Sequence, residues 1–281
     1  MIKWSKDIVT WRIGRAFYVS VPFTWLLPEA RCVAENYNGP VYAGGPAVDL
    51  MPEVMRDVAV LDEPSPVPPL AMHNPLATFT TRGCPNRCPF CAVPKIEGDF
   101  VELQDWPVRP IVCDNNILAS SREHFDRVID RLKGLPYVDF NQGLDASLLT
   151  PHHARRLAEL NGVKVRFAFD SLNDESVVAD AIVLARKHGL KDFGCYVLIG
   201  FHDTPNDALY RLEKLREWGI RPNPMRYQPL NALEKDCYVE EGWTNHELRR
   251  MMRYYSRLRW VEHIPYEDFQ HDGQKKLWKG E

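Results

Sequence analysis

The chain has 281 residues, 45% of them hydrophobic, which is enough for one large domain or two modest ones around a buried core. Its formal net charge of -3, from 35 basic and 38 acidic residues, excludes a global field that would draw it to nucleic acid or to an acidic membrane surface. It lacks the apolar run of a signal peptide or of a membrane span, so we expect a cytoplasmic protein with no membrane partner.

The first part of the chain, residues 1–61, alternates short apolar strands with helical stretches. This pattern predicts a small α/β subdomain that resembles a truncated Rossmann-like unit. Residues 62–77 are rich in proline and lack periodicity, so they are expected to form a linker at a domain boundary. The expected elements of the subdomain are strands at Phe17–Val21 and Val41–Ala43 and helices at Thr24–Asn36 and around Pro52–Val58.

Residues 78–232 follow a different pattern, a repeated succession of strand, loop and helix. Strands that alternate with helices of 10 to 15 residues predict right-handed βαβ units and a parallel sheet. Six such units predict an α/β fold, a partial (β/α)6 barrel of the TIM type, whose loops after the strands carry the chemistry. The strands are expected at Ala77–Thr81, Ile111–Cys113, Tyr137–Phe140, Val163–Phe169, Phe193–Ile199 and Met225–Pro229, and the helices at Ser121–Lys133, Pro151–Leu160, Glu175–His188 and Asn206–Trp218.

Residues 233–281 are expected to form a C-terminal helical extension. Asn245–Trp260 has the periodicity of an amphipathic helix, with five arginines spread around its polar side. Together with Tyr254 and Trp260, these arginines would suit phosphate contacts and base stacking, which makes nucleic acid a candidate substrate. The simpler interpretation, which we favour, is a solvated helix whose apolar side closes the barrel.

Three of the seven cysteines, Cys84, Cys88 and Cys91, lie within eight positions, directly after the first barrel strand. Thiolates bind iron and zinc well, and three of them on one tight loop can each bind a different iron of one cubane. The fourth iron then stays open for a substrate, whereas a structural metal is usually closed by a fourth protein ligand. The alternative is a zinc site that a distant histidine, His73 or His124, would complete.

The spacing CxxxCxxC, with the aromatic Phe90 before the third cysteine, resembles the signature of the radical S-adenosylmethionine superfamily. The resemblance covers about residues 78–231. It implies a [4Fe-4S] cluster on the three cysteines, S-adenosylmethionine bound at the open iron, and an external electron donor of the flavodoxin or ferredoxin type. It also implies reductive cleavage of S-adenosylmethionine to a 5′-deoxyadenosyl radical that abstracts hydrogen from a substrate, which the sequence does not identify.

The same resemblance implies that the loops after the later strands contact S-adenosylmethionine. The family's common Gly-Gly-Glu motif is absent, so Asp114 and Asn115 would bind the methionine amino group in its place. The alternative for this pair is an ordinary Asp/Asn turn, and for Asp170 it is helix capping. The candidate cofactor-binding residues are Phe90, Asp114, Asn115, Asn141, Gln142, Asp145, Asp170, Gly200 and Gln228.

Two weaker resemblances concern the segments around the barrel motif. Val41–Pro46 resembles the final part of the cobalamin-binding domain that precedes the barrel in one subgroup, although about 60 residues are too few for the full module and no DxHxxG motif is present. Cys91–Pro94, followed by Glu97 and Gly98, is similar to methylthiotransferases that modify transfer RNA or a ribosomal protein. The alternatives to hydrogen abstraction are methyl or methylthio transfer to nucleic acid, and a non-catalytic iron–sulfur or zinc module.

Overall fold

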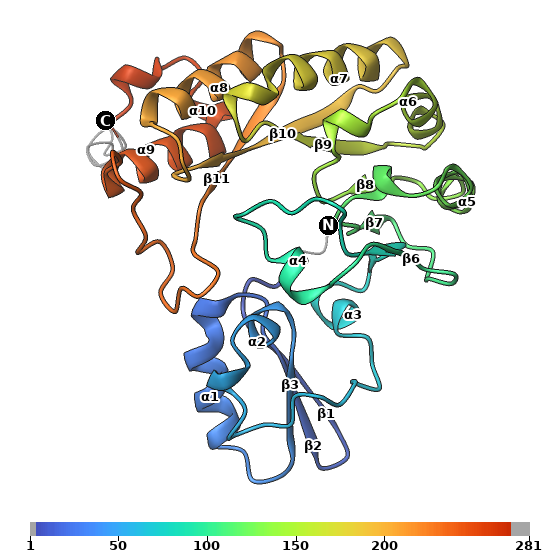
Figure 1. The fold of residues 1–281 in the computed structure, drawn as a ribbon, viewed down its shortest axis with the longest axis vertical. Coiled ribbons are helices and arrows are strands. Elements are labelled where there is room, and N and C mark those ends of the chain that lie inside the picture. The colour runs from blue at the N-terminus through green and yellow to red at the C-terminus, as the bar shows by residue number, and fades with distance from the viewer. Residues whose placement is uncertain (1–3, 271–281) are drawn as a thin grey trace, which may run out of the picture.

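The computed structural model, which describes residues 4–270, contains a small three-stranded sheet and a larger six-stranded sheet, each with its own hydrophobic core. Figure 1 shows the N-terminal part of the chain, in blue, at one end of the molecule and the larger sheet at the other end. No helix in residues 4–270 is long and apolar enough to span a membrane.

The small sheet and its helices form an N-terminal unit. Its elements are β1 (Val9–Ile13), β2 (Ala16–Ser20), α1 (Leu27–Glu35), β3 (Val41–Gly44) and α2 (Pro46–Leu50). Strand β2 pairs antiparallel with β1 and parallel with β3. Alternate residues of β2 and β3, namely Phe17, Val19, Val41 and Ala43, are buried in one core with α1 and α2. This unit is the small α/β unit that the sequence pattern predicts.

Two elements of this unit differ from the sequence prediction. Strand β1 was not expected, because it is mostly exposed and its apolar alternation is weak. The helix expected around Pro52–Val58 is instead α2 followed by a short 3-10 helix at Pro52–Val54. The chain enters α2 early because Gly45 has a φ of 101°, which suits glycine, and Pro46 occupies the first turn of the helix.

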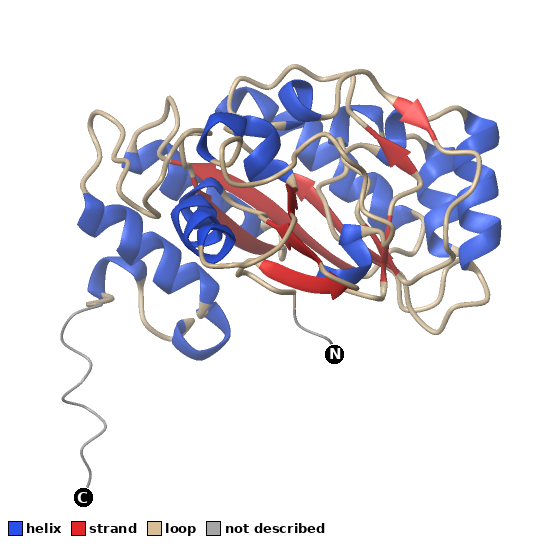
Figure 2. Ribbon diagram, turned by 90° about the horizontal axis from the view of Figure 1, so that it is seen from below, coloured by secondary structure: helices blue, strands red, loops and turns tan. Residues whose placement is uncertain are grey.

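The larger sheet is entirely parallel, with the strand order β11-β10-β9-β8-β7-β4. Figure 2 shows all the strands of the molecule in red, with helices around them. The predicted partial (β/α)6 barrel is therefore confirmed. Its elements are β4 (Ala77–Thr78), β7 (Ile111–Val112), α5 (Arg122–Leu132), β8 (Asp139–Phe140), α6 (Pro151–Ala158), β9 (Lys164–Ala168), α7 (Glu175–Lys187), β10 (Asp192–Ile199), α8 (Pro205–Glu217) and β11 (Arg221–Arg226).

The last strand, β11, begins at Arg221, four residues before its predicted start at Met225. Strand β11 contains Pro222 and Pro224, and proline argues against a strand in a sequence pattern. Within residues 4–270, β11 is an edge strand and pairs only with β10. The missing N–H groups of two prolines at alternate positions can therefore face away from the sheet. The two prolines are thus compatible with an edge strand, but the sequence pattern alone does not show that this strand lies at the edge of the sheet.

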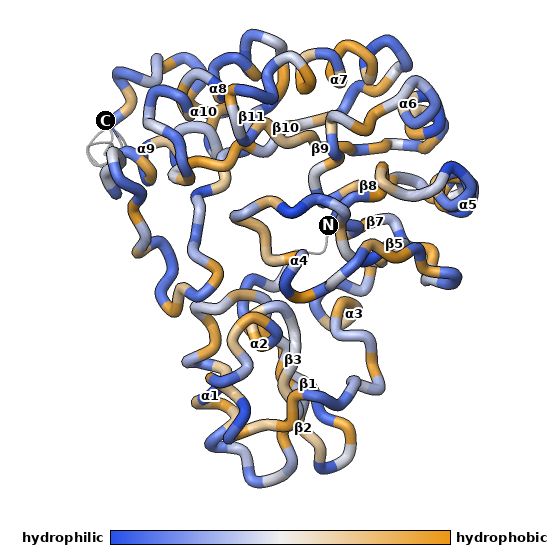
Figure 3. The backbone as a smooth tube through the Cα atoms, in the orientation of Figure 1, coloured by the Kyte–Doolittle hydropathy of each residue, from blue (hydrophilic) through white to orange (hydrophobic). Residues whose placement is uncertain are grey.

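A two-stranded ribbon frames the segment that holds the three cysteines. Strands β5 (Thr81–Arg82) and β6 (Val101–Glu102) pair antiparallel, and the short helix α4 (Val93–Ile96) lies between them in the chain. The predicted linker before this region is partly helical, because α3 (Pro69–His73) forms within it. In Figure 1, α4 lies between the N-terminal unit and the strands of the larger sheet, and Figure 3 shows the same arrangement coloured by hydropathy.

The C-terminal extension contains α9 (Asn245–Ser256) and α10 (Leu258–Val261), and α9 packs against the edge strand β11. Its apolar side is buried, as the simpler interpretation expects. Tyr254 is fully buried and its hydroxyl donates a hydrogen bond to the carbonyl oxygen of Ile264, so the expected stacking role for Tyr254 is wrong. Trp260 is 68% exposed. The expected extension continues to residue 281, and its part after residue 270 lies outside the described residues.

Residues 227–244, which we call the strap, connect β11 to α9 by way of the N-terminal unit. Figure 1 shows this segment reaching down from the larger sheet to the blue part of the chain. The Thr24 hydroxyl donates a hydrogen bond of 2.6 Å to the carbonyl oxygen of Ala232, and the Lys235 ammonium lies 6.0 Å from the centre of the Trp25 ring. The strap is therefore a second connection between the two sheets, besides the chain that contains α3.

Removing the Thr24 hydrogen bond is expected to loosen the strap and to leave both cores intact. Thr24→Val keeps the shape of this buried side chain, so the loss should be about 1 kcal/mol in the free energy of unfolding. Tryptic cleavage after Lys235 should accelerate severalfold. Thr10→Val is the control, because Thr10 is exposed on β1 and its side chain has no hydrogen-bond partner among the described residues. Equal cleavage rates in the two variants would contradict the proposed anchoring of the strap.

Candidate functional site

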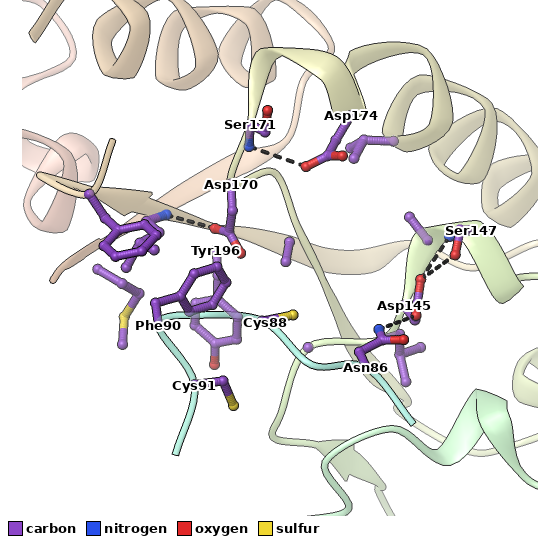
Figure 4. Close-up of a pocket in the computed structure, with 18 of the residues that line it drawn as sticks. Asn86, Cys88, Phe90, Cys91, Asp145, Ser147, Asp170, Ser171, Asp174 and Tyr196 are labelled. Atoms are coloured by element: carbon purple, nitrogen blue, oxygen red, sulfur yellow. Dashed lines mark hydrogen bonds between the residues drawn. The ribbon is translucent and has the colours of Figure 1, made fainter. Parts of the chain in front are cut away.

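A cavity of about 1040 Å³ lies at the carboxyl ends of the parallel strands, bordered by the cysteine loop. The loops after β7, β8, β9 and β10 all contribute side chains to it, as expected for a barrel of this type. Figure 4 shows Cys88, Cys91 and Phe90 together on one side, with Asn86 and Asp145 farther along the wall. The residues predicted from the sequence that line it are Cys84, Cys88, Cys91, Phe90, Asn115, Asn141, Gln142, Asp145 and Asp170.

The three cysteines are close enough to influence one another. All three are free thiols and partly exposed. Burial raises the pKa of Cys88, and the neighbouring thiolates of Cys91 and Cys84 raise it further. Burial also raises the pKa of Cys91, with Cys84 again contributing. The loop therefore presents three soft ligands to one space, as the sequence predicts.

Gly83 sets the path of the chain into the cysteine loop. Its φ is +72°, and a Cβ at this position would lie 2.8 Å from the carbonyl carbon of Asp99 and 3.1 Å from the Cα of Phe100. The loop thus passes directly against the chain that leads into β6, at a distance that only glycine permits. The close approach fixes the path of the chain directly before the first cysteine.

Glu97 holds both ends of the loop together. Its Oε2 accepts a 2.7 Å hydrogen bond from the Gly83 N–H and one of 2.8 Å from Asn115 Nδ2, and its Oε1 lies 3.1 Å from the Arg82 guanidinium. One carboxylate thereby connects the residue before Cys84, the segment after Cys91 and the loop after β7. The amide donors of Asn115 are partly used in this way, although Asn115 still lines the cavity.

Asp114 does not line the cavity, contrary to its predicted role in binding the methionine amino group. It is buried beneath the cysteine segment, where it accepts hydrogen bonds from the N–H groups of Thr80 and Thr81, at 2.6 and 3.0 Å, and from the Thr80 hydroxyl. Burial raises its pKa to about 6, against these hydrogen bonds. Asp114 therefore fixes the chain that enters the cysteine loop. Its position in sequence does not indicate that its side chain turns inward.

Gly200 and Gln228, two other predicted contacts, also lie outside the cavity lining. The Gly200 N–H donates a 2.9 Å hydrogen bond to Asp203, and a Cβ on Gly200 would lie 3.0 Å from Leu248 of α9. The Gln228 side chain bonds to Asp236 within the strap. The role expected for Gln228 assumes a sixth strand that continues to residue 229, whereas β11 ends at Arg226. Gly200 directly follows β10, as expected, but the side on which a Cβ would lie faces α9.

Asp170 reaches the cavity from the end of β9 and also accepts a 2.8 Å hydrogen bond from the Leu198 N–H of β10. Burial raises its pKa, and the nearby Arg211 opposes that shift. Helix capping, the alternative role, belongs instead to its neighbours, because Ser171 and Asp174 form a capping box. Figure 4 shows Asp170 pointing away from this box and toward Cys88 and Tyr196.

Arg211 of α8 is a site residue that the sequence does not reveal. It is only 1% exposed and donates to the carbonyl oxygens of Phe169 and Leu198, each at 2.9 Å, and to the carboxylate of Asp203. Burial lowers the pKa of Arg211, and Asp203 and Asp170 oppose that shift. The one available signal is an arginine at a position of α8 where the helix period expects an apolar residue.

Asn116 is a second residue that the sequence analysis missed. It is the third member of the run Asp114-Asn115-Asn116, and it lines the cavity beside Cys84. Its Nδ2 lies 3.8 Å from the Cys84 sulfur and 3.2 Å from Asp145 Oδ2. In this polar run after β7, Asp114 holds the chain before the cysteine loop, Asn115 bonds to Glu97 and Asn116 bonds to Cys84.

The histidines proposed for a zinc site lie elsewhere. His73 Nε2 is 2.9 Å from the Ser20 hydroxyl, and His124 is buried in α5 with its Nδ1 2.8 Å from Arg127. Neither lines the cavity. Across residues 4–270, no three His, Cys, Asp or Glu side chains are gathered around a point where they could hold one metal ion. This includes the three cysteines of the loop, which would each bind a different iron of a cluster.

The fold places this chain among proteins of known structure, although no family model and no curated protein sequence matches it. It is similar to the radical S-adenosylmethionine methyltransferase TsrM from Kitasatospora setae, solved with cobalamin and a [4Fe-4S] cluster, with a TM-score of 0.58 and 13% identity over 78% of this chain and 66% of that chain. Streptococcus suis SuiB aligns over 93% of this chain and 70% of its own, with a TM-score of 0.45 and 11% identity. The chain therefore shares the fold of this radical S-adenosylmethionine methyltransferase, a partial barrel of the kind that the order of its strands and helices predicts.

Proposed function

We propose that this protein is a radical S-adenosylmethionine enzyme, with a [4Fe-4S] cluster on Cys84, Cys88 and Cys91. The observation that carries the proposal is the position of three free thiols on one loop, at the carboxyl ends of the barrel strands, facing a cavity of about 1040 Å³. When bound, the cluster supplies the electron that cleaves S-adenosylmethionine to methionine and a 5′-deoxyadenosyl radical, which abstracts hydrogen from the substrate. An external flavodoxin-like or ferredoxin-like donor would supply that electron.

The residues around the cavity fit these cofactors. S-adenosylmethionine carries a sulfonium, an ammonium and a carboxylate group, so its net charge is positive. Among the described residues, the cavity lining contains five aspartates and one arginine, Arg211, which is itself paired with Asp203. Asn116 Oδ1 is buried without a hydrogen-bond donor among the described residues, so a ligand N–H group would satisfy it. These features favour a cationic ligand beside the cysteines.

Different residues of the cavity would then bind different groups of the ligand. Asp170 offers the carboxylate oxygen that Leu198 does not use to the hydroxyl or ammonium groups of the ligand, and Asn141 and Gln142 offer amides from the loop after β8. Phe90 packs edge-on against Phe201, with ring centres 5.5 Å apart, and this pair forms an apolar wall next to the thiols. The wall excludes water from the place where a radical would form.

A nucleic-acid substrate receives less support than the sequence suggested. The five aspartates of the cavity lining would repel a phosphate backbone. On the C-terminal extension, Tyr254 is unavailable for base stacking because it is buried. We therefore propose hydrogen abstraction from a substrate that is uncharged or cationic near the cavity.

The test is anaerobic reconstitution with iron and sulfide, followed by reduction with dithionite in the presence of S-adenosylmethionine. The unaltered protein should contain a [4Fe-4S] cluster and form 5′-deoxyadenosine. Variants with Cys84, Cys88 or Cys91 replaced by alanine should lose product formation at least a hundredfold. Cys32→Ala is the matched control, because Cys32 is exposed on α1 of the N-terminal unit. A protein that takes up zinc, or holds a cluster without forming 5′-deoxyadenosine, would contradict the proposal.

A further inference from the structure

We infer that Asn116 is a positioning residue that donates a hydrogen bond to the Cys84 thiolate and thereby raises the reduction potential of the cluster. The inference rests on the proposed function, since it concerns a cluster bound at Cys84. Its basis is the contact of 3.8 Å between Asn116 Nδ2 and the Cys84 sulfur, made by a side chain that is only 2% exposed. Among the described residues, neither Cys88 nor Cys91 receives a hydrogen bond from a side chain to its sulfur.

The orientation of the Asn116 amide follows from its neighbours. Nδ2 faces two groups that only accept hydrogen bonds when ionised, the Cys84 thiolate and Asp145 Oδ2, which is 3.2 Å away. Turning the amide by half a rotation would place its oxygen against both of these negative groups. The two N–H bonds of Asn116 thus have one acceptor each, and the sulfur receives one of them.

Asp145 holds this amide in place. Its Oδ2 accepts from Asn116 and also from Asn86 Nδ2, at 2.8 Å, while its Oδ1 accepts from the N–H and the hydroxyl of Ser147, at 3.1 and 2.6 Å. Asn86 lies inside the cysteine loop, between Cys84 and Cys88. One carboxylate on the loop after β8 therefore fixes both the cysteine loop and the donor that faces its first sulfur.

The effect on the cluster follows from the charge that reduction adds. A cluster with one more electron places more negative charge on its thiolate ligands, so an N–H dipole that points at a sulfur stabilises the reduced form more than the oxidised form. Because Asn116 is buried, water screens this dipole little. The hydrogen bond should therefore shift the reduction potential to a less negative value, so that a donor can reduce the cluster more easily.

The experiment is a redox titration of the reconstituted cluster, followed by electron paramagnetic resonance in the absence of S-adenosylmethionine. Asn116→Leu removes the donor and nearly keeps the volume, and its midpoint potential should be more negative than that of the unaltered protein. Asn173→Leu is the matched control, because Asn173 also lines the cavity but its side chain has no hydrogen-bond partner among residues 4–270. Its potential should equal that of the unaltered protein.

The outcomes separate this inference from the proposed function. If the unaltered protein assembles no [4Fe-4S] cluster, the proposed function fails. If Asn116→Leu assembles the cluster with an unchanged midpoint, the inference is overturned while the function stands. Should Asn116→Leu assemble no cluster, the unaltered protein labelled with ¹⁵N in its asparagine side-chain amides provides the test. Its reduced cluster should show a nitrogen coupling in pulsed resonance spectra, and the absence of any coupling would overturn the inference.

Discussion

Replacing Gly83 by alanine is expected to prevent assembly of the cluster at Cys84 and to lower the free energy of unfolding by about 3 kcal/mol or more. The new Cβ would lie 2.8 Å from the carbonyl carbon of Asp99 and 3.1 Å from the Cα of Phe100. Both neighbours are backbone atoms next to the β5–β6 ribbon, so they cannot rotate away as a side chain could. The loop must shift, and Cys84 with it. Iron content after reconstitution and urea unfolding measure the two effects.

Gly98→Ala is the control that isolates the steric part of this effect. Gly98 lies in the same connection between β5 and β6 and has a φ of +70°, nearly that of Gly83, but no atom lies within 4 Å of the place that its Cβ would occupy. Its substitution should cost only the backbone strain, about 1 kcal/mol, with normal iron content. If both variants bind iron equally well, then the close approach at Gly83 has no part in shaping the cysteine site.

Replacing Arg211 by methionine is expected to destabilise the barrel by about 3 to 5 kcal/mol, because it leaves a buried carboxylate without its cation. Arg211 connects the end of β9, through Phe169, with β10, through Leu198, and with Asp203 of the loop before α8. Asp203 also accepts a 3.1 Å hydrogen bond from the Trp243 indole, so the variant should weaken the attachment of the C-terminal extension as well. Urea unfolding measures the loss.

The loss should depend on pH in a defined direction. Burial already raises the pKa of Asp203 above its unfolded value, and Arg211 opposes that shift. Without Arg211 the folded-state pKa of Asp203 rises further. Above that pKa the folded protein must hold a buried, unpaired carboxylate, which lowers the free energy of unfolding. As the pH drops through that pKa, Asp203 becomes protonated and this destabilisation disappears. The difference between Arg211→Met and the unaltered protein should thus be smaller at about pH 5 than at about pH 8.

Two further variants make this prediction specific. Adding Asp203→Asn to Arg211→Met removes one unpaired charge, so it should recover part of the stability and reduce the pH dependence of the difference. The pH dependence that remains comes from Asp170, whose pKa Arg211 also lowers. Lys214→Met removes a cation from the exposed side of the same helix, where Lys214 pairs with Glu217, and should cost less than about 0.5 kcal/mol. A loss at Arg211 no larger than the loss at Lys214 would mean that the buried pair does not hold the strands together.

The order of strands and helices in the barrel was predictable because each unit carries a local signal. The helix α5 begins after the capping residue Ser121 and buries Phe125, Val128, Ile129 and Leu132 at helical spacing. The exceptions have physical reasons. Prolines at the sheet edge conceal β11, and the turn at Gly45 starts α2 earlier than the periodicity of the following residues suggests.

The site was predictable where the chain order itself carries the information. The three cysteines are adjacent in sequence, and six of the nine predicted contacts line the cavity because they follow barrel strands. The direction of a side chain was not predictable in this way, because Asp114 follows a strand as expected but turns inward to Thr80 and Thr81. Arg211 and Asn116 were missed because their roles depend on partners that the fold brings from distant parts of the chain.

The contact between Thr24 and the strap joins two residues that are 208 positions apart. Bringing the ends of such a long loop together costs about 5 kcal/mol of chain entropy, far more than one hydrogen bond returns. The contact can therefore form only after both sheets have folded, and it belongs to the last events of folding.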